Sequence, residues 1–268
     1  MKRGGLLIPA LVIAFVATAS ADQTSRAAAQ GAHRCPNEAV ILLVHGGGWW
    51  RGSPAIVSHA ADYTRRRSDL FKPVAVRYSL HSVARAFRDL ASSARYWRLR
   101  GCRVFAYGES NGANMVENLA SRGLVSAAAA VSPPTDLLSW SYRAHSYRTY
   151  GRDLSTPAGR AYAENSSSAP MSWAYLDATP SVLRRMSPSL HPYDARRQAP
   201  LLIFQSCDDT VVRCAMNLRY ARSDGGGARR PSNRIRYRPV HGDHATPAVK
   251  AASFRVSYRW FRYLVRRR

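Results

Sequence analysis

Residues 108–112 (GESNG) place a serine between two glycines in the pattern G-x-S-x-G. The pattern follows the apolar run at 103–107 and precedes a stretch with helical spacing, which is the setting in which it holds a nucleophile. The glycines let the chain turn sharply, so the serine hydroxyl is lifted above the sheet. We therefore predict Ser110 to be a nucleophile rather than only a helix cap.

A serine hydroxyl is a weak nucleophile until a base takes its proton. His241 and His244 both follow the last strand-like run, in the segment VHGDHATP. His244 is preferred as the base because it lies farther into the loop and nearer the final helix. His241 is kept as the alternative.

The histidine in turn needs a carboxylate to orient it. The segment SCDDTVV, after the run LLIFQ, offers Asp208 and Asp209. Asp209 is preferred, Asp208 is the alternative, and Asp136 after the preceding strand is an outside candidate. The chain order serine, aspartate, histidine is the one expected for a serine on a strand-to-helix turn.

Three glycines follow the first apolar run in HGGGWW, residues 45–50. Attack on an acyl carbon creates an oxyanion, and fixed N–H donors aimed at that oxygen are commonly worth about 3–4 kcal/mol each. Bare backbone can approach such an oxygen closely, so Gly47 and Gly48 are predicted donors, together with the N–H of Asn111. The His45 side chain is expected to brace the loop rather than to carry protons.

Strand-like runs alternate with helix-like stretches along most of the chain. Strands are predicted at 40–44, 73–78, 103–107, 125–131, 201–205 and 235–240, and helices at 53–67, 83–99, 110–122, near 214–223 and from Thr246 onward. This alternation predicts an α/β fold with a mostly parallel sheet covered on both faces. Such sheets carry their chemistry at the carboxyl ends of the strands, where all the residues above lie.

The first residues resemble an export signal, with a basic start, an apolar stretch and the small residues 19–21. We expect residues 1–21 to be a signal peptide cleaved near Ala21, residues 22–38 to be a lead-in, and residues 39–268 to form the folded domain. The mature protein is therefore expected to be secreted or otherwise extracytoplasmic.

Four cysteines in an exported chain can form two disulfides. Cys207 and Cys214 close a short loop, whereas Cys35 and Cys102 each precede a strand-like run. The starts of neighbouring parallel strands lie about 5 Å apart, within disulfide reach. We predict the pairs 35–102 and 207–214.

The net charge is +24, and nearly all of the cations are arginine. Such a charge attracts anionic surfaces or polymers. No zinc-finger, helix-turn-helix or RNA-recognition signature is present, so we expect no dedicated nucleic-acid role. The residues also call for no metal and no cofactor.

These motifs together resemble the α/β-hydrolase superfamily, and within it the carboxylesterases and lipases with an HGGG oxyanion motif. The matching segments are HGGGW, VRYSL, GESNGAN, SCDDTVV and GDH. The resemblance implies a triad of Ser110, His244 and Asp209 acting through an acyl-enzyme, on a sheet trimmed to about six strands. It also implies that the aromatic segment 136–198 is a lid or cap.

The favoured function is therefore a secreted serine hydrolase that cleaves a small-molecule or lipid carboxylic ester. A serine peptidase or amidase with the same triad is one alternative, although no propeller domain accompanies it. A basic surface-binding protein that keeps only the fold is another, and the complete set of three side chains argues against it.

Overall fold

The computed structural model of the chain describes residues 35, 37–67, 70–138, 178–191, 197–223 and 234–267. Internal contacts divide the chain into two units, residues 1–34 and 35–268, and only the second is described below. The predicted signal peptide and nearly all of the lead-in lie outside the described residues, as does most of the predicted lid.

Six parallel strands form one sheet in the order β2-β1-β3-β4-β5-β6. The strands are β1 (Ala39–Val44), β2 (Phe71–Ala75), β3 (Arg103–Glu109), β4 (Ala127–Val131), β5 (Leu201–Gln205) and β6 (Ile235–Pro239). The predicted α/β class, with a mostly parallel sheet of about six strands, is confirmed.

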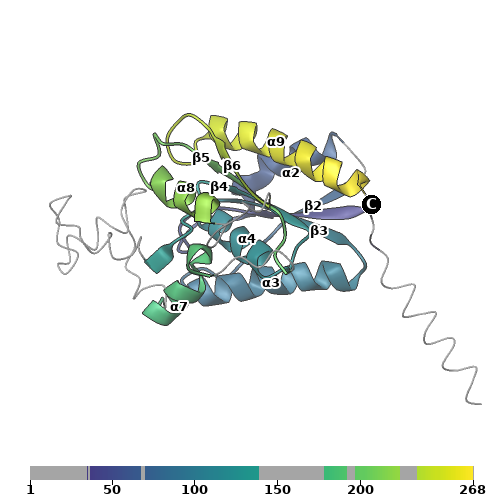
Figure 1. Cartoon of the computed structure of the whole chain (residues 1–268). Helices are drawn as coiled ribbons and strands as arrows, with labels where there is room; N and C mark the ends of the chain where they lie inside the picture. Colours follow the sequence, from purple (N-terminus) through teal and green to yellow (C-terminus); the bar gives the residue numbers. More distant parts are fainter. Residues whose placement is uncertain are drawn as a thin grey trace, which may run out of the picture. The chain divides into compact units, whose positions relative to one another are not determined.

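Helices cover both faces of this sheet (Figure 1). They are α2 (Ser58–Arg65), α3 (Val83–Leu99), α4 (Asn111–Ser121), α7 (Pro180–Arg185), α8 (Cys214–Ser223) and α9 (Pro247–Arg266), with short 3-10 turns at η1 (Pro54–Val57) and η3 (Pro188–Leu190). One apolar cluster joins the sheet to α3, α4 and α7, and a second joins its other face to α2 and α9. In the described part of the chain, no helix has the length and apolar character needed to cross a membrane.

The residues of strand β1 show that helices pack on both faces of the sheet. Its residues alternate between the two clusters, with Val40 and Leu42 on the α3–α4 side and Ile41 and Leu43 on the α2–α9 side, and all four are fully buried. A strand buried on both faces needs an unbroken apolar run rather than an alternating one. Val44 is also fully buried, so the strand leads straight from the core into the glycine loop.

The second strand begins and ends earlier than predicted, at 71–75 instead of 73–78. Pro73 lies inside it, paired with Ile41. Proline has no N–H, so it is tolerated where one side of the strand has no neighbour, and β2 is an edge strand. Because the strand ends early, Tyr78 leaves the sheet and its ring stacks on His45.

The helices follow the prediction closely except at 53–67, where Pro54 begins the 3-10 turn η1 and α2 starts only at Ser58. Helix α9 begins as expected, with Thr246 in an extended conformation and Pro247 in the first turn. The Thr246 side chain makes no capping hydrogen bond, so proline and backbone geometry define this helix start.

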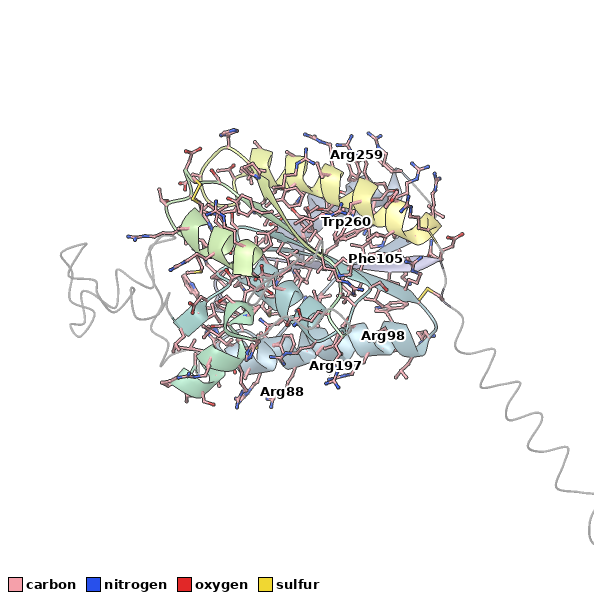
Figure 2. All side chains as sticks on the ribbon, viewed as in Figure 1. Arg88, Arg98, Phe105, Arg197, Arg259 and Trp260 are labelled. Carbon is pink, nitrogen blue, oxygen red and sulfur yellow. A yellow bond between two sulfur atoms is a disulfide. The ribbon has the colours of Figure 1, made fainter. Side chains whose placement is uncertain are left out.

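Arginines line the outer sides of both helical layers. Figure 2 shows Arg88 on the outer side of α3 and Arg259 on the outer side of α9, whereas Phe105 lies between the sheet and α9. The Phe105 and Phe261 rings are 5.0 Å apart and anchor that helix.

Two disulfides join the predicted cysteine pairs. Cys35 is bonded to Cys102, which ties the segment before β1 to the start of β3. Cys207 is bonded to Cys214, which closes the loop between β5 and α8. The second bridge spans Asp209, so it fixes the loop that carries the predicted acid.

Candidate active site

Ser110 lies in the sharp turn between β3 and α4. Its backbone is in the left-handed region, with φ 55° and ψ −121°, and its amide donates a 2.8 Å hydrogen bond to the Val131 carbonyl. Gly112 packs so tightly that a Cβ there would lie 2.4 Å from the His45 carbonyl oxygen. A Cβ on Gly108 would meet the Gly112 carbonyl oxygen at 2.3 Å, so both glycines are required by the turn.

The structure brings Ser110, His244 and Asp209 together in one line. The Ser110 Oγ is 2.9 Å from His244 Nε2, and His244 Nδ1 is 2.9 Å from Asp209 Oδ2. Ser110 and His244 are half-buried, whereas Asp209 is buried. Three loops distant in the sequence therefore form a hydroxyl–imidazole–carboxylate chain that can transfer a proton.

Asp209 is held by several donors at once. Its Oδ1 accepts the amides of Val211 and Val212 at 2.9 and 2.8 Å, and its Oδ2 accepts the Gln205 side-chain amide at 2.9 Å. Burial alone would raise the pKa of Asp209, but the hydrogen bonds from His244, Val212 and Gln205 outweigh it and lower that pKa. The carboxylate is therefore ionised and fixed in orientation.

The alternative acid and base lie apart from this line. Asp208 is exposed, and its Oδ2 accepts bonds from the Ser206 hydroxyl and the Gly242 amide, both at 3.3 Å. His241 is exposed and makes no hydrogen bond within the described ranges. Asp136, the outside candidate, is not among the hydrogen-bond partners of the His244 ring, which are Ser110 and Asp209.

Asp243 is a functional neighbour that sequence reasoning missed. Its Oδ1 accepts the Thr210 amide and hydroxyl, both at 2.9 Å, and the His244 amide at 2.6 Å. One carboxylate thus ties the loop of the acid to the loop of the base. The bond from the Thr210 amide is the main cause that lowers the pKa of Asp243.

A buried amide network stands behind Asp209 and was also missed. Gln205 at the end of β5 accepts the Asn217 amide at 2.6 Å, and Asn217 accepts the Thr135 hydroxyl. All three side chains are fully buried. Only the position of Gln205 at the carboxyl end of a strand hinted at this role, since Asn217 is one of several polar residues on α8.

The glycine loop packs against the serine turn. A Cβ on Gly46 would lie 3.2 Å from the Ser110 Cβ, and Gly47 and Gly48 have φ of 118° and 66°. The Gly48 amide, predicted as a donor to substrate, donates a 2.7 Å bond to Asn111 Oδ1. Trp49 after it is fully buried in the core and anchors the loop.

His45 braces this loop. The ring is buried and stacked on Tyr78, with Nδ1 3.0 Å from the Tyr78 hydroxyl. Burial lowers the pKa of His45, although a hydrogen bond to the Gly46 carbonyl opposes the shift. A buried ring favours the neutral form, which suits a bracing role.

A cluster of charges lies directly behind the serine turn, on the α2–α9 side of the sheet. Glu109 is fully buried, with Lys250 Nζ 3.0 Å from Oε2 and His59 Nε2 3.4 Å from Oε1. The Tyr107 hydroxyl donates to Glu109 Oε1 at 3.3 Å. Burial raises the pKa of Glu109, and Lys250 is the main group that opposes the rise.

Comparison with known proteins identifies the fold. No family model matches the sequence, and no curated protein matches it. Solved structures of an esterase from the Planctomycetes species Thermogutta terrifontis are similar. The propionate-bound form is 18% identical with a TM-score of 0.61 and covers 86% of this chain and 85% of that one.

Two further structures of that esterase agree. The apo form is 18% identical, with a TM-score of 0.61 and coverage of 85% of this chain and 84% of that one. The form phosphorylated by paraoxon is 16% identical, with a TM-score of 0.61 and coverage of 85% and 83%. At this identity the likeness concerns the fold alone, and this chain shares the fold of those solved structures.

Proposed function

We propose that this protein is a serine hydrolase that cleaves a carboxylic ester through an acyl-enzyme on Ser110. The observation that carries the proposal is the chain of contacts from Asp209 through His244 to the Ser110 hydroxyl. Asp209 Oδ2 lies 2.9 Å from His244 Nδ1, and His244 Nε2 lies 2.9 Å from the Ser110 Oγ. The esterase fold of the similar structures supports it.

The proposed reaction has two halves. The Ser110 oxygen attacks the ester carbonyl carbon while His244 Nε2 takes the hydroxyl proton, which forms a tetrahedral oxyanion. Collapse of this intermediate expels the alcohol, which leaves with the proton from His244. A water molecule then attacks the acyl carbon with His244 again as base, and it releases the carboxylic acid and restores the serine.

Likeness to the similar esterase favours esters with a small acyl group as substrates, and the fixed Asp209 carboxylate favours acyl transfer in general. The similar esterase was solved with propionate and with butyrate bound. In this chain, Asp209 is locked by donors so that His244 keeps one orientation, as acyl transfer requires. The alternatives remain a peptidase or amidase with the same triad and a surface-binding protein without turnover.

A fluorophosphonate probe and an ester panel test the proposal. We expect the probe to label wild type but not Ser110→Ala, and p-nitrophenyl acetate and butyrate to be hydrolysed faster than matched p-nitroanilides. His241→Ala is the matched control for His244→Ala, because only the second should abolish turnover. Labelled protein that cleaves anilides faster would support the amidase, and folded protein that resists the probe would overturn the proposal.

Activity should also depend on pH. General-base catalysis needs an unprotonated imidazole, so kcat/KM should fall in acid. A rate that is unchanged down to pH 4 would contradict the role given to His244.

We further propose that the protein is exported and that its bridges form outside the cytosol. Stable disulfides are typical of oxidising compartments. Mass spectrometry of secreted material should find a chain that begins near Asp22 with no free thiol. Free Cys207 and Cys214 in that material would contradict the expectation.

The exposed arginines on α9 support an attraction to anionic surfaces or polymers. Arg255, Arg259, Arg262 and Arg266 form one exposed ridge, and no acidic residue occurs in the helix. We expect tighter binding to phosphatidylserine vesicles than to phosphatidylcholine vesicles, with a loss at high salt.

A matched pair of variants locates that attraction. Arg259→Glu with Arg262→Glu should weaken vesicle binding at least tenfold. Arg85→Glu with Arg88→Glu, an identical charge change on exposed residues of α3, should weaken it less. Equal losses would mean that the net charge of the whole protein, rather than the α9 ridge, is responsible.

A further inference from the structure

The Asn111 side chain joins the two halves of the predicted oxyanion site. Its own main-chain N–H follows the nucleophile, and its Oδ1 accepts the Gly48 amide of the glycine loop at 2.7 Å. Sequence reasoning gave Asn111 only its main-chain N–H. The side chain is 1% exposed, so it is part of the buried structure rather than a solvated substituent.

The orientation of this side-chain amide follows from its neighbours. The Gly48 N–H can only donate, so it requires the carbonyl oxygen of Asn111. The Asn111 Nδ2 then faces the Tyr78 hydroxyl and donates to it at 3.0 Å. The same hydroxyl donates to the His45 carbonyl oxygen at 3.0 Å, at the start of the glycine loop.

These contacts hold the glycine loop at two points, and we call this set of hydrogen bonds among Asn111, Tyr78, His45 and Gly48 the brace. Asn111 holds the loop at Gly48, and through Tyr78 it holds the loop again at His45. Tyr78 and His45 are both buried, so water cannot easily replace these bonds. The loop between the two attachment points contains Gly46 and Gly47.

We propose that Asn111 is a positioning residue whose side chain withdraws the Gly48 N–H from substrate binding and fixes the Gly47 N–H and its own N–H as the two oxyanion donors. This inference rests on the proposed function. Preorganised donors act without reorganisation during the reaction, so a loop held at both ends serves catalysis better than a mobile loop.

The main test replaces the side chain and keeps the main-chain donor. Asn111→Ala should lower kcat for p-nitrophenyl butyrate about 10- to 100-fold, which is less than the roughly 10²- to 10³-fold loss seen when an oxyanion donor is removed, because the donors are only displaced, while KM changes less than threefold. Rates are normalised to sites titrated with the fluorophosphonate. An unchanged or increased kcat would overturn the proposal, because it would mean that the Gly48 N–H is better used by the substrate.

Asn114→Ala is the matched control. Asn114 lies one turn along α4, is fully buried, and uses its amide to bind the carbonyls of Pro134 and Met186. We expect this variant to melt at a lower temperature with kcat per titrated site within twofold of wild type. If it loses kcat as strongly as Asn111→Ala, the effect is general loosening of α4 and the proposal fails.

Tyr78→Phe tests the brace without touching Asn111. It should lower kcat less than Asn111→Ala does, and the double variant should be no slower than Asn111→Ala alone, because both act through one network. Additive losses would overturn the shared brace. This variant also keeps the proposal testable if Asn111→Ala does not fold.

Amide hydrogen exchange gives a readout that needs no turnover. The Gly48 amide should exchange at least tenfold faster in Asn111→Ala than in wild type, and equal rates would overturn the proposal. A wild-type protein that hydrolyses no ester would remove the proposed function, whereas this exchange comparison would still decide the role of Asn111.

Discussion

Glu109 and Glu117 lie on either side of the serine turn, and both are completely buried, but they have opposite surroundings. Glu109 is surrounded by Lys250, His59 and the Tyr107 hydroxyl. Neither carboxyl oxygen of Glu117 has a hydrogen-bond partner among the described residues.

The comparison shows what burial does to a carboxyl group with and without partners. Burial raises both pKa values, but Lys250 opposes the rise at Glu109, whereas burial alone acts at Glu117 and raises its pKa well above the usual value of 4.5. The fold therefore holds one carboxyl group that has a cationic partner and one that burial alone shifts toward the neutral form. Five substitutions test this difference.

Removing Lys250 should have the largest effect. In Lys250→Met the Glu109 carboxyl stays buried without its main partner, so the free energy of unfolding should fall by about 3 kcal/mol at pH 7. Urea denaturation measures this fall, which should shrink at pH 5, where Glu109 can be protonated. A loss that is equal at both pH values would mean that Lys250 acts only through packing.

Replacing Glu117 should have the opposite sign. Glu117→Leu should raise the free energy of unfolding by about 2 kcal/mol at pH 7, because it removes a buried carboxyl that no described donor satisfies.

The gain from Glu117→Leu should grow with pH. Above pH 4.5 the unfolded chain releases the Glu117 proton while the folded chain keeps it, so wild type loses up to roughly 1.4 kcal/mol per pH unit until the raised pKa is reached. Glu117→Gln should flatten the same part of the stability profile. If both variants track wild type across pH 5–8, the Glu117 carboxyl does not titrate as inferred.

Glu109→Gln should cost less than Lys250→Met. The Lys250 side chain is 22% exposed and can turn toward water when its partner is lost, whereas the Glu109 side chain, at 1%, cannot. We expect a loss of about 1 kcal/mol by urea denaturation. A loss of stability larger than the one in Lys250→Met would mean that Lys250, rather than Glu109, is the group that is more costly to leave without its partner.

Tyr107→Phe should have the smallest effect. It removes the hydroxyl that donates to Glu109 and to the Lys250 carbonyl, at 3.3 and 3.2 Å. A loss of about 0.5 kcal/mol is expected, at the lower end of the range for one hydrogen-bonding group, because both contacts are long. Thermal melting resolves this difference, and a stabilised variant would show that the hydroxyl is poorly satisfied in the native state.

The fold could be predicted because local patterns determine it. Apolar runs such as 40–44 and 201–205 must be buried on both faces, and the helical spacing at 83–99 gave that helix its observed bounds. The bounds of the edge strand were predicted wrongly. A proline is tolerated inside a strand only where one side of that strand has no neighbouring strand. The sequence does not reveal which strand lies at the edge, because strand order depends on tertiary contacts.

The site could be predicted only in part. Ser110, His244 and Asp209 were predicted from chain order and strand ends, and their side chains meet in the structure. The contacts of Asn217, Asp243 and the Asn111 side chain were not identified, because each joins loops that are far apart in the sequence. Glu117 could not be recognised as an unpartnered acid either, since its surroundings depend on how α4 packs.

The bridge between Cys35 and Cys102 has a practical consequence for attaching the protein to a solid support. It joins the chain just ahead of β1 and β3, at the amino ends of strands whose carboxyl ends lead to the glycine loop and to Ser110. A resin coupled through residues ahead of Cys35 would pull on the end of the sheet farthest from the chemistry. The covalent bridge would carry that load into the centre of the sheet, so the immobilised protein should keep the carboxyl ends of its strands turned toward the solution.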